Sequence, residues 1–483
     1  MTDTATSSCA PRARTKIVAT VGPACRQPEQ LAELLKAGVD VFRLNMAHAD
    51  WQQQAAVVQT IREVCKQHNY TCAILIDLAG PKIRLGELPT REIACLAGAE
   101  FHFIRGDESA DPARLVTTYE PLVDELDVHD RIMLADGTVG MVVLEKTADA
   151  VRCRVTQPGT ISSRQGVNLP GAKLKAPAMS DIDRDNAVWA AHAGIDYVSL
   201  SFVRQADEVR DLKGLLRSYG SQAKVVAKIE KQEALDQLEA IIEAADAVMV
   251  ARGDLGVEID VARTPVEQKR IIALCNRRHK PVIVATQMLD SMRHSRLPTR
   301  AEVTDVANAI LDGCDACMLS GETAVGDHPP VVVEMMNRIA LATEPLIRAR
   351  PAAPLADKPL EELHRVTEAV VSGVGHIAAQ LDAKLVVVVT HTGATALALS
   401  KQRSHVPILG ITDSETVLRQ MCLFWGVTPL AGVNARDSYQ LLHYIERWGQ
   451  MEQALKTGDR VVLVSGIGLV AAGHNMLVVH EVT

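Results

Sequence analysis

Two apolar runs of the sequence end on ionisable side chains that could carry out chemistry together. The run that begins at Val225 ends on Lys228 and Glu230, and the run that begins at Val248 ends on Asp254. The interior of a buried strand excludes such groups, so we expect them at the carboxyl ends of two strands, facing a site. A lysine and two carboxylates there could hold a divalent cation against an anionic substrate and stabilise developing negative charge. For either run alone, a structural ion pair at the rim of a barrel would explain the same residues.

The elements that must position these residues recur eight times along the chain. Apolar, β-type runs occupy residues 16–22, 39–46, 73–78, 196–203, 224–230, 247–255, 281–287 and 316–323. Helix-length amphipathic segments separate most neighbouring runs, as at 205–219, 232–244, 265–279 and 299–312. Eight strand-helix units predict an α/β fold, a (β/α)8 TIM barrel, whose active site lies at the carboxyl ends of its strands.

One connection is far longer than an ordinary loop, because roughly a hundred residues separate the third run from the fourth. Residues 88–174 consist of short alternating stretches with turn signals, which predicts a small inserted β-barrel that acts as a lid. We therefore assign 15–87 and 175–345 to the catalytic barrel. The polar residues 1–14 are expected to form a disordered N-terminal segment.

A third domain is expected after the barrel. Residues 346–358 are punctuated by prolines and are interpreted as a linker, and 359–483 form a C-terminal α/β domain of regulatory type. Its buried-type strands are expected at 384–390, 406–412, 427–431 and 461–465.

The bulk composition excludes several classes of protein. A net charge of −8 gives no basic field for nucleic acid or anionic lipid, and 3% aromatic residues disfavour base-stacking platforms. No run of eighteen apolar residues exists, so no membrane partner is expected. The ten cysteines are scattered, mostly within apolar runs, which is typical of reduced thiols in a cytoplasmic protein.

Polar residues accumulate at the ends of the other predicted strands as well, in motifs that follow one another in order. The motifs are Thr15-Lys-Ile-Val-Ala-Thr-Val-Gly-Pro23, Arg43-Leu-Asn45, Gly80-Pro-Lys-Ile-Arg84, Val167-Asn-Leu-Pro-Gly171, Ala227-Lys-Ile-Glu230, Ala251-Arg-Gly-Asp-Leu-Gly256, Ala285-Thr-Gln-Met-Leu289 and Met318-Leu-Ser-Gly-Glu-Thr323. Together they resemble the signatures of the pyruvate kinase family, with a looser match through the C-terminal domain. Several ordered motifs are much more specific than any one of them.

The resemblance implies a glycolytic phosphotransferase that converts phosphoenolpyruvate and ADP to pyruvate and ATP with Mg²⁺ or Mn²⁺. It implies catalytic roles for Arg43, Lys228 and Thr286. It further implies the substrate-binding residues Gly253, Asp254 and Ser201, the metal ligands Glu230 and Asp254, and the nucleotide-binding residues Pro23, Asn45, His48, Arg84 and Asp136. A homotetramer and a phosphorylated effector in the C-terminal domain are also implied. Ser201 could instead satisfy backbone groups, and His48 could be a capping or packing residue.

The chain departs from the family pattern where many members hold potassium. Asn45 and Asp77 of the potassium site are kept, but Ala47 and Leu78 replace its other two ligands. Lys82 stands where those members carry glutamate, as in the potassium-independent branch of the family. An ammonium and a monovalent cation are both compact unit charges, so we expect activity without potassium. The alternative is that Lys82 is a solvated loop cation.

Two further places differ from the family pattern. The lid position usually held by a lysine carries Gln165, with Arg164 beside it, and the sequence does not decide which contacts nucleotide. The effector loop, 390–396, keeps three hydroxyls and Gly393 but lacks basic residues, and 466–474 also departs. A phosphate site there remains open, and its ligand is not readable.

Two other functions are compatible with parts of this pattern. A metal-dependent lyase acting on pyruvate or oxaloacetate would use an Asp/Glu metal pair but would not explain Arg43, His48 or the insertion. A catalytically silent regulatory paralogue would keep the fold, although retention of Lys228, Glu230 and Thr286 argues against it.

Overall fold

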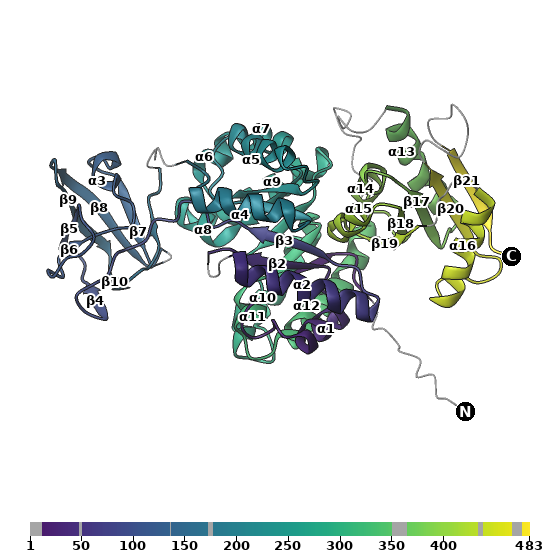
Figure 1. Cartoon of the computed structure of the whole chain (residues 1–483), viewed down its shortest axis with the longest axis horizontal. Helices are drawn as coiled ribbons and strands as arrows, with labels where there is room; N and C mark the ends of the chain where they lie inside the picture. The colour runs from purple at the N-terminus through teal and green to yellow at the C-terminus, as the bar shows by residue number, and fades with distance from the viewer. Residues whose placement is uncertain are drawn as a thin grey trace.

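The chain contains three regions in a row, with a closed barrel between a β-rich insertion and a C-terminal α/β domain (Figure 1). This computed structural model describes residues 12–47, 51–135, 137–171, 177–349, 365–432, 438–465 and 476–483. His48, Asp136, most of the predicted N-terminal segment, residues 350–358 of the predicted linker and 466–474 lie outside the described residues. No helix within these ranges is long and apolar enough to cross a membrane.

The barrel has eight parallel strands, which confirms the predicted fold. They are β1 (Lys16–Thr20), β2 (Val41–Asn45), β3 (Ala73–Asp77), β12 (Tyr197–Leu200), β13 (Lys224–Ile229), β14 (Ala247–Ala251), β15 (Val282–Ala285) and β16 (Ala316–Leu319). The surrounding helices are α1 (Pro28–Ala37), α2 (Trp51–His68), α4 (Asp181–His192), α5 (Ala206–Ser218), α6 (Gln232–Asp236), α7 (Leu238–Ala244), α9 (Thr264–Arg277), α10 (Arg300–Asp312) and α12 (Pro329–Thr343). Short helices follow strand ends and loops: α8 (Arg252–Glu258), α11 (Gly321–Ala324), η1 (Val261–Arg263), η2 (Asp290–Arg293) and η3 (Glu344–Ala349).

Three of the sequence predictions need correction here. The predicted helix at 232–244 is two helices, because the backbone leaves the helical conformation at Gln237 (φ −110°, ψ 20°). The predicted strand at 247–255 ends at Ala251, where α8 begins at once. Residues 12–14, expected in the disordered segment, are bound to the barrel, since the Arg14 amide donates to Glu344 Oε1 at 2.9 Å.

Alternate residues of each barrel strand face two different cores. In β1, Ile17 and Ala19 pack outward against the helices, whereas Val18 faces the barrel interior. The interior cluster continues without a break into the C-terminal domain, where it includes Val388 and Phe424. The base of the barrel, where its strands begin, is therefore sealed by that domain.

Four aspartates join neighbouring strands at this base through hydrogen bonds. Each directly precedes one strand and accepts a hydrogen bond from a backbone amide of the preceding strand in the barrel. The pairs are Asp40 with Ile17 (2.9 Å), Asp196 with Ile74 (2.8 Å), Asp246 with Val225 (2.8 Å) and Asp315 with Val282 (2.7 Å). We call these residues the base aspartates.

The insertion between β3 and β12 is β-rich, as its alternating stretches predict. It contains β4 (Glu92–Cys95), β5 (Glu100–Ile104), β6 (Arg114–Leu115), α3 (Leu122–Glu125), β7 (Arg131–Leu134), β8 (Val139–Lys146), β9 (Ala150–Gln157), β10 (Gly159–Ser162) and β11 (Val167–Asn168). Six strands form one sheet in the order β11-β7-β8-β9-β5-β6, and β10 pairs with β4. Phe103, Ile132 and Val143 belong to its own buried core.

The C-terminal domain has a five-stranded sheet in the order β19-β18-β17-β20-β21. Its elements are α13 (Arg365–Gln380), β17 (Leu385–Val389), α14 (Ala394–Lys401), β18 (Ile408–Thr412), α15 (Glu415–Gln420), η4 (Met421–Leu423), β19 (Val427–Ala431), α16 (Ser438–Met451), β20 (Arg460–Ser465) and β21 (Met476–Glu481). The sequence did not predict β21, which is half exposed and pairs antiparallel at the edge.

Candidate active site

Lys228 is the centre of a charge cluster at the carboxyl ends of the barrel strands. Its Nζ lies 3.4 Å from Asp77 Oδ1 and 3.5 Å from Glu230 Oε2, and it donates to Ser201 Oγ at 2.7 Å. Burial by itself would lower the pKa of Lys228, but the charges of Asp77 and Glu230 outweigh it and the pKa is raised. The ammonium is therefore a fixed positive charge in a site that is largely closed to solvent.

Arg43 and Asp77 extend the cluster along β2 and β3. Arg43 donates to Asp77 Oδ2 through Nε at 2.9 Å, and to Thr20 Oγ1 at 3.0 Å. Burial would raise the pKa of Asp77, but Lys228 and Arg43 lower it to about 2. Ser199 Oγ also donates to this carboxylate, at 2.5 Å. Asp77 therefore stays ionised and fixes both cations.

Glu230 is a buried carboxylate whose hydrogen bonding is incomplete. Its Oε1 accepts from the Phe202 amide at 2.5 Å, whereas its Oε2 accepts no hydrogen bond from the described residues. Burial, together with the negative charge of Asp254, raises its pKa to about 6 against the effect of Lys228. An unsatisfied buried carboxylate next to a second carboxylate is the donor set that a divalent cation needs, so Glu230 and Asp254 fit a metal.

The protein supplies few ligands beyond these two carboxylates. No group of three or more His, Cys, Asp or Glu side chains that could hold a metal occurs among the described residues. Mg²⁺ is usually bound through one or two carboxylates together with water and substrate oxygens, so two protein ligands suffice.

Thr286 and Gly253 face each other across the ends of β14 and β15. Thr286 Oγ1 accepts from the Gly253 amide at 2.8 Å and donates to the Ala285 carbonyl at 2.7 Å. Thr286 has φ of 69°, a costly conformation for a β-branched residue, and Gln287 follows with φ of 54°. Arg252 donates to the Thr286 carbonyl at 2.9 Å and so holds this strained turn in place.

The residues expected to bind nucleotide lie along the first three strand ends and the insertion. Pro23 follows Gly22, where a Cβ would lie 2.4 Å from the Ala324 carbonyl oxygen, so only glycine fits this turn. Arg84 is partly buried and donates to the Arg164 carbonyl at 3.2 Å. Asn45 Oδ1 accepts from the Ala47 amide at 3.0 Å.

Arg164 and Gln165 are both engaged within or next to the insertion. Arg164 Nε donates to Glu87 Oε1 at 2.6 Å, with 77% of its side chain exposed. Gln165 Oε1 accepts from the Ser162 amide at 2.8 Å. Neither side chain contacts the Lys228 cluster in the described part of the chain.

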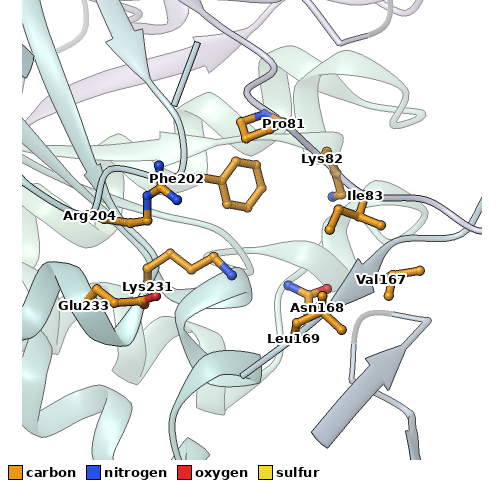
Figure 2. A pocket seen from close by; sticks show the side chains of 10 residues that line it. All are labelled: Pro81, Lys82, Ile83, Val167, Asn168, Leu169, Phe202, Arg204, Lys231 and Glu233. Carbon is orange, nitrogen blue, oxygen red and sulfur yellow. The ribbon is translucent and has the colours of Figure 1, made fainter. Parts of the chain in front are cut away.

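Lys82 lines a cleft at the junction of the barrel and the insertion (Figure 2). Pro81, Lys82 and Ile83 lie on one side with Val167–Asn168, and Phe202 and Lys231 lie on the barrel side. Within the ranges that the structure describes, no hydrogen bond or ion pair joins the Lys82 side chain to Asp77 or Asn45. Asn45 and Asp77 are themselves neighbours in the register of β2 and β3.

The sequence reasoning missed several residues that build this site. Ser199 holds Asp77, Arg252 holds Thr286, and the Phe202 amide holds Glu230. Phe202 has φ of 55°, and no pattern in the sequence predicted this backbone conformation. A signal was present for Arg252, a charged residue directly after a buried strand. Ser201 accepts from Lys228 and donates to the Leu78 carbonyl at 2.7 Å, so it fixes the lysine to the backbone of the barrel.

Comparison with known proteins agrees with this geometry. Residues 12–333 match the family profile "Pyruvate kinase, barrel domain" and residues 368–480 match "Pyruvate kinase, alpha/beta domain". The chain is 37% identical over 474 residues to the pyruvate kinase of Geobacillus stearothermophilus, covering 97% of this chain and 80% of the relative. It is 40% identical over 475 residues to pyruvate kinase 2 of Synechocystis, covering 97% and 79%.

A solved structure is similar over the whole chain. The crystal structure of a pyruvate kinase from Cryptosporidium parvum has a TM-score of 0.90 and 32% identity, and covers 99% of both chains. Fold, motifs and site geometry therefore lead to one assignment: the chain belongs to the pyruvate kinase family.

Proposed function

We propose that the chain transfers the phosphoryl group of phosphoenolpyruvate to ADP, with pyruvate and ATP as products. The observation that carries this proposal is the buried cluster in which Asp77 fixes Arg43 and Lys228 beside Glu230. A loose phosphoryl-transfer transition state spreads negative charge over the moving group, so preorganised cations stabilise it. A lyase on the same barrel would not need two cations held at this point.

Lys228 and Arg43 act on the two charges that develop during the reaction. As the bond between phosphorus and the enol oxygen breaks, the leaving pyruvate enolate gains negative charge, which Lys228 stabilises. Arg43 stabilises the oxygens of the phosphoryl group as its new bond to the ADP β-phosphate forms. A divalent cation held by Glu230 and Asp254 would supply further charge neutralisation to these phosphate oxygens.

Thr286 and the Gly253 amide are proposed to orient the substrate carboxylate. In this structure they are bonded to each other at 2.8 Å, so each would exchange that partner for a carboxylate oxygen. The Thr286 hydroxyl, or a water next to it, then protonates the enolate carbon to give pyruvate. The strained turn fixes the position of this hydroxyl, which lowers the cost of orientation.

A coupled assay tests the reaction directly. Pyruvate formed from phosphoenolpyruvate, ADP and Mg²⁺ is measured with lactate dehydrogenase, and omission of ADP or of the divalent cation is expected to abolish the signal. Pyruvate formation that is independent of ADP would contradict the proposal and favour a lyase. Absence of pyruvate, with phosphoenolpyruvate still bound, would favour the silent paralogue. Mn²⁺ in place of Mg²⁺ tests the breadth of the metal site.

We further infer that the enzyme works without potassium. Lys82 carries a unit positive charge in the cleft between the barrel and the insertion, the Ala47 side chain has no oxygen to offer a cation, and no side-chain partner of Lys82 occurs within the described residues. Turnover in sodium-only buffer is expected to equal turnover with added potassium. Lys82→Glu is expected to create a potassium requirement, whereas the control Lys66→Glu, on the exposed side of α2, is not. Strong potassium dependence of the unaltered enzyme would overturn the inference.

The assembly is proposed to be a homotetramer, a state supported by membership of the family. Light scattering after size-exclusion chromatography is expected to give four times the chain mass of 52.2 kDa. A mass of one or two chains at micromolar concentration would contradict it.

A further inference from the structure

Two free thiols contact each other where α2 leads into β3, away from the candidate active site. Cys65 Sγ lies 3.2 Å from Cys72 Sγ, and both residues belong to the buried core around the barrel. A disulfide bond has an S–S distance of about 2 Å, so the two sulfur atoms would have to approach by only about 1 Å. The described residues contain a second pair of neighbouring thiols, Cys314 and Cys317, whose sulfur atoms are farther apart, at 3.8 Å. Of these two pairs, Cys65 and Cys72 are the better placed to form a disulfide.

A turn of the backbone brings the two thiols together. α2 ends at His68, and Asn69 follows with φ of 56°. The Tyr70 amide donates to the Cys65 carbonyl at 2.9 Å, and a hydrogen bond of this span closes a helix that is followed by a left-handed residue. The chain then reverses, so that Cys72, directly before β3, returns to the last turn of α2. The contact between the thiols therefore follows from the path of the backbone.

Two arginines make the surroundings of Cys65 cationic. Arg62 precedes Cys65 by three residues on α2, which places both on one face of the helix, and its Nη1 donates to the Cys72 carbonyl at 3.2 Å. Arg62 and Arg419 each pair with Asp196 at 2.7 Å. The hydrogen bond that Cys72 donates lowers the pKa of Cys65, and the two arginines lower it further, against burial and the charge of Asp196. The same hydrogen bond, together with burial, raises the pKa of Cys72.

The two thiols also differ in their access to solvent. Cys65 is 8% exposed and Cys72 is 1% exposed. Residues 66–69, which follow Cys65, are exposed, so the turn lies at the surface of the protein. A small oxidant therefore reaches Cys65 first, and Cys65 is also the thiol that ionises more readily. Because the thiolate is the nucleophile, Cys65 is the attacking thiol and Cys72 the resolving one.

We propose that Cys65 and Cys72 form a redox-active pair, in which hydrogen peroxide converts the two thiols to an intramolecular disulfide and a dithiol reductant restores them. The Cys65 thiolate attacks one peroxide oxygen, so that an S–O bond forms, the O–O bond breaks, and the leaving hydroxide takes up the proton that Cys65 released. Cys72 Sγ then attacks the sulfenic acid on Cys65. The S–S bond forms, the S–O bond breaks, and a second water leaves with the proton of Cys72. The thiols lose two electrons and the peroxide gains them.

The proximity of Cys72 makes the oxidation reversible. A sulfenic acid without a resolving thiol is oxidised further to sulfinic acid, which a thiol reductant does not restore. The disulfide would join the end of α2 to the residue before β3, the strand that carries Asp77 at its other end. Neither thiol takes part in the proposed phosphoryl transfer, so the inference goes beyond that function and does not depend on it.

Peptide mapping of the full-length, folded protein tests the proposal without turnover. The protein is treated with a small molar excess of hydrogen peroxide, the remaining thiols are alkylated, and trypsin is added without reduction. Trypsin cleaves after Arg62, Lys66 and Lys82, so the two cysteines fall in separate peptides, 63–66 and 67–82, which contain no other cysteine. The linked pair of peptides is expected as the main disulfide product, and dithiothreitol should separate it.

Two results of this mapping would overturn the proposal. One is that the linked peptides do not form, or that Cys65 is recovered as sulfinic acid in their place. The other is a main disulfide between Cys314 and Cys317. That bond lies within the single tryptic peptide 301–338, so it is recognised by the loss of two hydrogen atoms from one peptide.

Three variants assign the roles of the thiols. Cys72→Ala is expected to stop at the sulfenic acid, which dimedone labels in peptide 63–66. Cys65→Ala is expected to slow oxidation of Cys72 at least about tenfold, because the more acidic thiol is lost. The matched control is Cys422→Ala, which removes a thiol that donates to the Thr71 carbonyl at 3.6 Å, and the yield of linked peptides should not change. Oxidation of Cys72 at an unchanged rate without Cys65, or loss of the linked peptides in folded Cys422→Ala, would overturn the proposal.

Discussion

Buried charged side chains are paired differently at the two ends of the barrel strands. At the base, Asp315 is fully buried, and its Oδ2 accepts from the Val282 amide and from Lys401 Nζ while Arg403 lies 3.1 Å from its Oδ1. At the carboxyl end, Glu230 is equally buried, but its Oε1 accepts only from the Phe202 amide. Its Oε2, which like Asp315 Oδ1 accepts no hydrogen bond from the described residues, lies 3.5 Å from a single cation, Lys228, which Asp77 shares. The base compensates its charges within the protein, whereas the active-site end leaves charge available for ligands. This difference separates residues that stabilise the barrel from residues that perform its chemistry.

The largest effect on stability is expected from a substitution that removes a buried ion pair at the base of the barrel. Asp315→Ala should lower the free energy of unfolding by about 3–5 kcal/mol, because it leaves Lys401 buried without its partner. Urea unfolding followed by circular dichroism measures the change. The control is Asp207→Ala, whose partner Arg210 is exposed, and it should cost less than about 1 kcal/mol. Equal losses of unfolding free energy in the two variants would contradict the view that buried ion pairs at the base stabilise the barrel.

A loss of turnover of about 10²–10³-fold is expected from Lys228→Met, since one preorganised charge is removed from the site where negative charge develops. The matched control is Lys16→Met, which removes a buried lysine at the base, paired with Asp40 at 3.3 Å. The turnover of Lys16→Met should stay within about threefold of the unaltered enzyme, because Lys16 lies at the base of the barrel, where residues stabilise the fold. Steady-state kinetics with both substrates saturating distinguishes the two, and similar losses would contradict the division of roles.

The pH dependence of stability should report on Lys401. Burial lowers its pKa from 10.5 to about 8, although Asp315 acts in the opposite direction. Between these two values the unfolded chain binds the proton more tightly than the folded chain, so the contribution of Lys401 to stability rises with pH. The difference in unfolding free energy between the unaltered protein and Lys401→Met should grow by up to about 3 kcal/mol from pH 8 to 10.5. A difference that is flat or falls over this range would be incompatible with a buried, charged lysine.

The smallest effect is expected at the rim of the insertion. Arg164 and Glu87 form an exposed pair that solvent screens, so Arg164→Ala should change KM for ADP less than about fivefold. Gln165→Ala should behave similarly, because its amide oxygen is used inside the insertion. A larger rise in KM for ADP in one variant would identify that residue as a nucleotide contact.

The barrel and the order of its site residues could be predicted from the sequence because they rest on local patterns. Buried β-type runs followed by polar residues give both the strands and the end at which Lys228, Glu230 and Asp254 lie. The predicted runs were too long where a helix starts directly after a strand, as at Arg252. Periodicity alone does not show such a change of backbone direction.

The supporting contacts could not be predicted, since they depend on distant residues. The bond from the Phe202 amide to Glu230 joins two strands and requires φ of 55° at Phe202. A sequence pattern also marks the base aspartates, although it did not enter the prediction. A Gly or Ala stands two positions before each of them, as in Gly194-Ile195-Asp196. A recurring aspartate directly before a β-type run is therefore as informative about the barrel as a polar residue directly after one.

The base aspartates also have a mechanical consequence for the insertion. The insertion is attached to β3 and β12, which pair from Leu75 with Tyr197 to Asp77 with Ser199 and are further joined by Asp196. Both attachment points therefore belong to one rigid, two-stranded mount. A movement of the insertion as one unit would break none of these hydrogen bonds in the barrel wall, so it would leave the frame of the barrel undisturbed.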